Sequence, residues 1–277
     1  MTKFVRLLHF EWNRIFKFLI GFMIFIFVSQ LGSILYSALS YKNNVITNGL
    51  RQGMSPKEIV NMYSEFSSFH FTYHTLFILP MGIGIGAILF YIFFIWYRDW
   101  LGKNNFIYRL LMLPISRMKV YLAKLTTILL AVLSLVTVQY LFLYFYEMII
   151  KLIIPEAYRM HISPIEIVKS SELLLVLPPD GLLFIFAYLA GTLVVMLLFT
   201  LVLLERSYKL VGIAIGVVYI AVVLGITIGS FVYQIVSFNK LYFYPGEMTL
   251  IYIVLWFVFI SITFFWNRQL MKRKITV

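Results

Sequence analysis

Six long runs of apolar residues, separated by shorter polar segments, dominate this sequence. Each run is about as long as an α-helix must be to cross the ~30 Å hydrocarbon layer of a bilayer, which takes about 20 residues. The runs are apolar on all sides and about twice the length of the ~10-residue alternating strands of a membrane barrel, so they predict helices. The six predicted spans are residues 18–39, 75–97, 125–150, 182–204, 211–236 and 248–266.

This pattern predicts an all-α, polytopic membrane protein with six transmembrane helices in a single domain over residues 1–277. The composition agrees, because 62% of the residues are hydrophobic and only 12% are charged. A soluble domain of this size could not bury so much apolar surface, and disorder needs low hydrophobicity. The chain has no cysteine, which excludes thiol catalysis, disulfides and sulfur-ligated metals.

The positive charges alternate between the two sides of the predicted membrane. Sixteen of the 23 Lys and Arg residues lie before the first span, in the second and fourth loops, and after the last span. Because positive residues resist translocation, we expect these segments and both termini on the cytoplasmic side of the cell membrane. The net charge of +12 is then mainly a topology signal, and no nucleic-acid partner is expected.

The segment before the first span, residues 1–17, predicts an amphipathic helix at the inner membrane surface. Its cations suit anionic headgroups, and Trp12 suits the interface. Two interpretations remain open, a positively charged topology anchor and a mechanical elbow joined to the first span. The apolar face of this helix would hold Phe4, Val5, Leu8, Trp12, Ile15 and Phe16.

Two outer polar segments, residues 40–74 and 151–181, each contain a helix-start pattern. Ser55-Pro56-Lys57-Glu58 and Ser163-Pro164-Ile165-Glu166 place proline after a serine and an acid three residues after that serine. This is the spacing of an N-cap, an N1 proline and a capping box. A short helix is therefore predicted in each segment.

The 98–124 connection between the second and third spans predicts a short amphipathic helix on the cytoplasmic side. Asn104 or Asn105 can cap it, Pro114 ends it, and Ser116 can cap the next helix. Two interpretations remain open at this point, a helix that a soluble partner grips to move two spans and a solvated basic loop. The apolar face of the predicted helix would hold Phe106, Ile107, Leu110 and Leu111.

The connection resembles that of the permease subunits of type 2 ABC exporters. Arg98-Asp99 precedes a stretch that reads Leu-Met-Leu-Pro-Ile-Ser-Arg over residues 111–117, and Lys124 follows. In that family an acidic residue after the second span precedes a similar stretch and a lysine; the usual Arg/Lys-Glu pair is Arg98-Asp99 here. The resemblance implies coupling to an ATPase through Arg98, Asp99, Phe106, Arg109, Leu110, Leu111, Pro114, Ser116 and Arg117.

The resemblance further implies a six-helix subunit paired with a second copy or a paralogue and driven by separate ABC ATPase subunits. The chain itself has no G-x-x-x-x-G-K-[ST] pattern, so we expect no enzyme activity and no bound cofactor in this polypeptide. ATP and Mg would be used by the partner ATPase. Apolar, aromatic and methionine-rich spans favour an amphiphilic or hydrophobic cargo of peptide, lipid-like or drug-like character.

Three small-xxx-small pairs of glycines predict close helix packing, because glycine lets another helix approach. They are Gly82 with Gly86, Gly212 with Gly216, and Gly225 with Gly229.

Few other residues in the spans carry candidate chemistry. Glu147 lies near the predicted outer boundary, where it can pair with Lys151 one turn later or contact the cargo. His70 and His74 are one turn apart but lack the further ligands of a metal site, so no metal is expected. No Ser/His/Asp catalytic triad is predicted from the sequence.

Two other functions remain as alternatives. An ion-coupled secondary transporter usually needs acids or broken helices near the bilayer midplane, and the spans offer only the peripheral Glu147 and Pro80. A noncatalytic assembly or regulatory subunit would keep its partners when Leu110, Leu111 and Arg117 are replaced by alanine.

Overall fold

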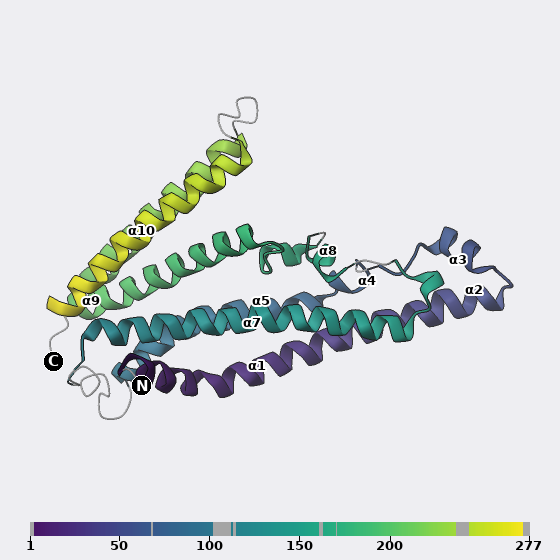
Figure 1. Cartoon of the computed structure of the whole chain (residues 1–277), viewed down its shortest axis with the longest axis horizontal. Helices are drawn as coiled ribbons and strands as arrows, with labels where there is room; N and C mark the ends of the chain where they lie inside the picture. The colour runs from purple at the N-terminus through teal and green to yellow at the C-terminus, as the bar shows by residue number, and fades with distance from the viewer. Residues whose placement is uncertain are drawn as a thin grey trace. The chain divides into compact units, whose positions relative to one another are not determined.

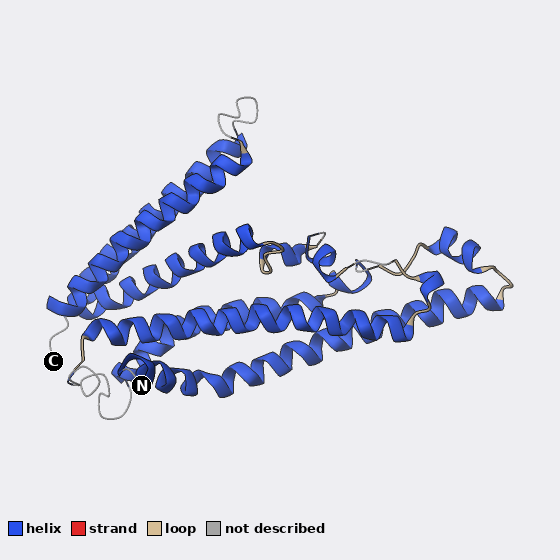
Figure 2. Cartoon of the chain, viewed as in Figure 1, coloured by secondary structure: helices blue, strands red, loops and turns tan. Residues whose placement is uncertain are grey.

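The computed structural model describes residues 3–67, 69–101, 112, 115–160, 163–169, 171–236 and 244–273. Within these ranges the chain consists of helices and loops (Figure 2), and the only strand-like feature is an isolated bridge between Phe66 and Arg159. The all-α prediction is confirmed. The longer helices are α1 (Lys3–Tyr41), α5 (Thr75–Leu101), α7 (Arg117–Ile153), α9 (Gly181–Val236) and α10 (Pro245–Arg273). The shorter ones are η1 (Lys42–Thr47), α2 (Asn48–Arg51), α3 (Pro56–Tyr63), α4 (Phe69–Thr72), η2 (Glu156–Tyr158), α8 (Pro164–Lys169) and η3 (Glu172–Leu175).

Five helices of the described chain are long and apolar enough to cross a membrane, where the sequence predicted six spans. They are compatible with a membrane protein. The difference lies in α9, which contains both the fourth and the fifth predicted span. The predicted loop between them has no Gly or Pro to end a helix, and the helix leaves regular geometry only at Lys209, with φ 56° and ψ −133°. Figure 1 shows the chain turning back on itself within α9.

The predicted surface helix and the first span form one continuous helix, α1. No Gly or Pro lies between Lys3 and Ile20 to break it. On its first part, Leu7, Glu11 and Ile15 are buried. These residues are four positions apart and therefore lie on one face of the helix.

The chain forms two compact units, and α1, α5 and α7 contribute to both. Unit 1 contains residues 1–12, 89–129 and 181–277, and unit 2 contains residues 13–88 and 130–180.

Unit 2 has an apolar core with one polar cluster inside it. Ile34, Phe77 and Val168 are fully buried in this core. Gln139 Nε2 donates to Gln30 Oε1 at 2.9 Å, and Gln30 Nε2 donates to the Phe77 carbonyl at 3.3 Å. An unsatisfied amide would be costly in an apolar interior, so these bonds let two glutamines sit between α1, α5 and α7.

Both predicted capping boxes are confirmed in the polar part of unit 2. At the start of α3, the Ser55 N–H donates to Glu58 Oε2 at 2.7 Å, and the Glu58 N–H donates to Ser55 Oγ at 3.4 Å. At α8 the Ser163 N–H donates to Glu166 Oε2 at 2.8 Å, and the Glu166 N–H donates to Ser163 Oγ at 3.3 Å. These bonds satisfy backbone donors that a helix start leaves open.

Unit 1 contains the two halves of α9 and the helix α10 packed on them. Leu193 and Leu197 of the first half and Val223 of the second half are buried together. The rings of Phe186 and Trp256 lie 4.4 Å apart, which brings α10 against the first half as well.

Candidate functional site

Four charged side chains from three helices meet in the interior of unit 1. Glu11 lies near the start of α1, Arg98 and Asp99 in the last turn of α5, and Lys124 two turns into α7. We call these four residues the buried ion network. Glu11 is 2% exposed, and Asp99 and Lys124 are not exposed at all.

Lys124 joins the three helices. Its Nζ donates to Glu11 Oε1 at 2.7 Å, to the Ile95 carbonyl at 3.0 Å, and to Asp99 Oδ2. A lysine ammonium has three N–H donors, so each donor has an acceptor. The same nitrogen lies 5.3 Å from the centre of the Trp96 ring, where the π-electrons favour a cation.

Arg98 completes the charge balance of the network. Its Nη2 donates to Glu11 Oε2 at 3.0 Å, and its Nε lies 4.0 Å from Asp99 Oδ1. Two carboxylates therefore face two cations. A buried charge is tolerated only when it is paired and hydrogen-bonded, so the four side chains depend on one another.

The network lies next to both ends of the 98–124 connection. Helix α5 ends at Leu101, two residues after Asp99, and α7 begins at Arg117, directly after Ser116 as the sequence predicted. The ion pairs fix these two ends relative to each other and to the start of α1.

Further contacts in unit 1 tie the same helix ends to α9 and α10. Arg117 Nη1 donates to the Met271 carbonyl at 3.2 Å, and Asn267 Nδ2 donates to the Tyr121 hydroxyl at 3.0 Å. The Tyr97 hydroxyl donates to Glu205 Oε2. The guanidinium of the next residue, Arg206, lies 5.0 Å from the centre of the Trp100 ring.

The residues that the resemblance assigns to ATPase coupling are divided by the limits of the described chain. Arg98 and Asp99 belong to the buried ion network, and Ser116 and Arg117 lie at the start of α7. The remaining five lie outside the described residues: Phe106, Arg109, Leu110, Leu111 and Pro114.

The glycine pairs differ in what surrounds them. A Cβ at Gly212 would lie 1.9 Å from the carbonyl oxygen of Leu204, and one at Gly216 would lie 2.6 Å from Leu201 Cδ1. This pair therefore lies where the two halves of α9 approach each other. In unit 2 the close approach is at Gly84, where a Cβ would be 2.8 Å from the Phe22 ring. A Cβ at the other predicted positions would meet no described atom within 4 Å: Gly82, Gly86, Gly225 and Gly229.

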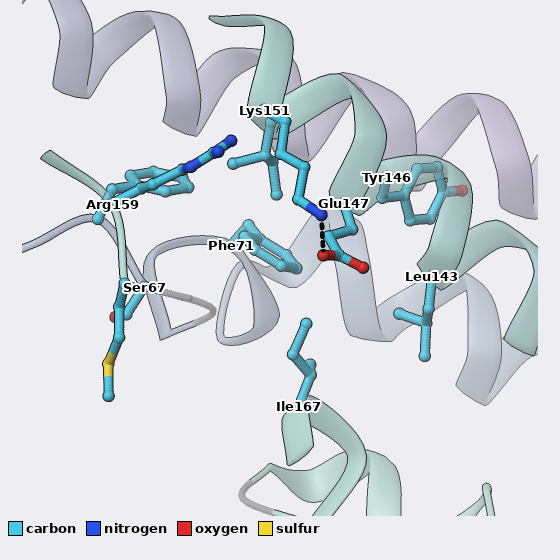
Figure 3. Close-up of a pocket in the computed structure, with 11 residues that line it drawn as sticks. Ser67, Phe71, Leu143, Tyr146, Glu147, Lys151, Arg159 and Ile167 are labelled. Atoms are coloured by element: carbon cyan, nitrogen blue, oxygen red, sulfur yellow. Dashed lines mark ion pairs between the residues drawn. The ribbon is translucent and has the colours of Figure 1, made fainter. Parts of the chain in front are cut away.

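Glu147 lies in unit 2 and pairs with Lys151 one turn later, with 2.5 Å between Oε1 and Nζ. Figure 3 shows this ion pair projecting from α7 into a pocket. In the described part of the chain, no group of three His, Asp or Glu side chains is arranged to hold a metal ion.

Sequence reasoning did not assign a role to two residues of the network. Glu11 is the only acid among residues 1–17, and it lies four residues from both Leu7 and Ile15, which is the signal that places it on a buried face. Lys124 directly precedes an apolar span, where a lysine needs a partner.

No protein-family model, curated protein or solved structure matches this chain.

Proposed function

We propose that this chain is the membrane-embedded permease subunit of an ATP-driven exporter. In this proposal a separate ATPase binds the 98–124 connection and moves the helices that flank it. The permease pairs with a second copy or a paralogue in the cytoplasmic membrane, and its cargo is amphiphilic or hydrophobic. The two halves of α9 each cross the bilayer, which gives six crossings and places both termini in the cytoplasm.

The observation that carries this proposal is the buried ion network. A force on a loop moves a bundle only if the ends of that loop are held firmly to the helices of the bundle. The network joins both ends of the 98–124 connection to α1, and Arg117 joins one end to α10. A displacement of the connection would therefore act on several helices together rather than on a loose loop.

In this proposal the energy comes from another chain. The sequence has no phosphate-binding loop, and the charges of the buried ion network are balanced within the protein. Proton-coupled transport would need an acid that exchanges protons with water, and the carboxylates of Glu11 and Asp99 are buried.

The proposal is tested by purifying the full-length chain from its own membranes in mild detergent and identifying the chains that accompany it. We expect an ATPase with a phosphate-binding loop. After reconstitution in vesicles, the permease should stimulate ATP hydrolysis, and the double variant Leu110→Ala, Leu111→Ala should lose most of this stimulation while the complex stays assembled.

Leu152→Ala is the matched control, because Leu152 is an exposed leucine at the opposite end of α7. It should leave the stimulation unchanged. Recovery of no ATPase, or cargo movement by the isolated chain without nucleotide, would contradict the proposal. Association with an ATPase that is insensitive to both variants would instead indicate a regulatory subunit.

A further inference from the structure

A pocket in unit 2 lies at the end of α7 where the sequence predicts the outer membrane boundary. Its walls are apolar and come from several elements, with Phe66, Phe71 of α4, Leu143 of α7 and Ile167 of α8 among them. Figure 3 shows Glu147 and Lys151 projecting into the space between Phe71, Leu143 and Ile167. The pocket therefore combines an apolar lining with charged groups.

Three charged residues line the pocket: Glu147, Lys151 and Arg159. Glu147 and Lys151 pair with each other, so their charges cancel. Arg159 lies to one side of this pair (Figure 3), and its Nη1 is buried without a hydrogen-bond partner among the described residues. Together the three residues leave one positive charge and an unused, desolvated donor.

The backbone around Arg159 is held in place. The Phe66 N–H donates to the Tyr158 carbonyl at 2.8 Å, and the Met160 N–H donates to the Phe66 carbonyl at 3.0 Å. These two bonds fix the residues on both sides of Arg159 to the wall that Phe66 forms. A backbone held in this way does not have to become ordered when a ligand arrives, which lowers the entropy lost on binding.

We propose that this pocket binds an anionic phospholipid of the surrounding membrane, with the phosphate on Arg159 and the adjoining apolar part of the lipid against Phe71, Leu143 and Ile167. A buried donor without a partner favours an acceptor, and an arginine favours phosphate because its planar group gives two parallel hydrogen bonds. The apolar walls and the predicted membrane boundary favour a lipid over a free anion. This site does not depend on an ATPase.

The charges of Arg159 and Glu147 predict opposite effects of their removal on lipid binding. Arg159→Gln removes the unpaired cation, so binding of the lipid should weaken about tenfold, the usual scale for one charged hydrogen bond. Glu147→Gln removes the carboxylate that neutralises Lys151, so binding should strengthen severalfold. A structural role of these residues alone would not produce changes of opposite sign.

The experiment uses the full-length chain, stripped of lipid in detergent, and native mass spectrometry during titration with phosphatidylglycerol. Phosphatidylcholine and inorganic phosphate are titrated in parallel. Arg51→Gln is the matched control, because it removes an exposed arginine of unit 2 outside the pocket. We expect tight binding of phosphatidylglycerol alone, sensitive to Arg159→Gln and insensitive to Arg51→Gln.

If Arg159→Gln does not fold, Met160→Glu takes its place. Met160 lines the pocket but is 54% exposed, so an added carboxylate there should be tolerated and should weaken the binding. The proposal is overturned if Arg159→Gln and Arg51→Gln behave alike, if Glu147→Gln weakens binding, or if phosphatidylcholine binds equally well. Equal binding of inorganic phosphate also overturns it, because the site would then recognise a free anion.

Discussion

At the scale of single residues, the buried charge of Lys124 is stabilised by its neighbours and not by water. Its side chain has no exposed surface, and its three acceptors, Glu11, Asp99 and the Ile95 carbonyl, lie on α1 or α5. Lys119, on the same helix five residues earlier, is exposed. The two lysines carry the same charge, so they separate the effect of a buried ion pair from that of net charge.

Lys124→Met should lower the free energy of unfolding by about 3–5 kcal/mol, because it leaves Asp99 buried without its closest cation. Lys119→Met should change it by less than about 0.5 kcal/mol. Adding Asp99→Asn to Lys124→Met should recover part of the loss, since the remaining Glu11 and Arg98 still balance each other. Denaturant unfolding in detergent micelles measures all three, and equal stability of the two lysine variants would refute the role of the network.

At the scale of elements, the start of α3 should respond to pH. The hydrogen bond from the Ser55 backbone N–H lowers the pKa of Glu58 from its ordinary value of 4.5, and the bond with the Ser55 side chain lowers it further. A lowered pKa means that the carboxylate stabilises the folded helix above pH 4.5. This contribution is lost as the pH falls through the lower folded value.

Hydrogen exchange of residues 55–63, corrected for its intrinsic pH dependence, should therefore show less protection of this helix as the pH falls below 4.5. In Glu58→Gln the step should be absent, because glutamine accepts the same bond and does not titrate. A step of equal size in that variant would assign the effect to another group.

The turn within α9 is the second feature at this scale. Gly212→Ala places a methyl group against the Leu204 carbonyl oxygen, and backbone cannot move aside as a side chain can. We expect a loss of about 1–3 kcal/mol of stability. Gly225→Ala is the control in the same helix, where the new methyl group meets no described atom, and it should be neutral or stabilising by up to about 1 kcal/mol. A thermal melt that ranks the variants in the opposite order would contradict this packing.

The sequence predicted those elements whose cause is local. The helix starts at Ser55 and Ser163 follow from the reciprocal bonds of four neighbouring residues, and α7 begins directly after Ser116, the predicted cap. The bend of α9 at Lys209 lies between the fourth and fifth predicted spans, but its geometry was not predicted, because this segment has no Gly or Pro turn signal. The close approach of Gly212 and Gly216 to Leu204 and Leu201 joins the two sides of the bend, and no pattern within one span contains such a contact.

At the scale of the whole molecule, the candidate site was predictable only in part, because it depends on contacts between residues far apart in the sequence. Arg98 and Asp99 were singled out for a coupling role because they are adjacent to each other and precede a recognisable stretch, but their place in a buried ion network was not predicted. Glu11 is 87 residues from Arg98 and 113 residues from Lys124 along the chain. Burial and pairing at such separations come from packing between helices, which no pattern within one segment contains.

The number of membrane crossings is also a property of the whole molecule. Because the chain has no cysteine, this number can be tested with single introduced cysteines. If each half of α9 crosses, Tyr208→Cys lies on the same side as Lys119→Cys, and both should react with a membrane-impermeant maleimide only after the cells are opened. Lys57→Cys and Lys169→Cys should react in intact cells. If only the second half of α9 crossed, Tyr208 would lie on the outer side with Lys169, and if a single crossing ran through the bend, Tyr208 would lie within the bilayer. Labelling of Tyr208→Cys in intact cells would therefore reject six crossings, even with both helix halves intact.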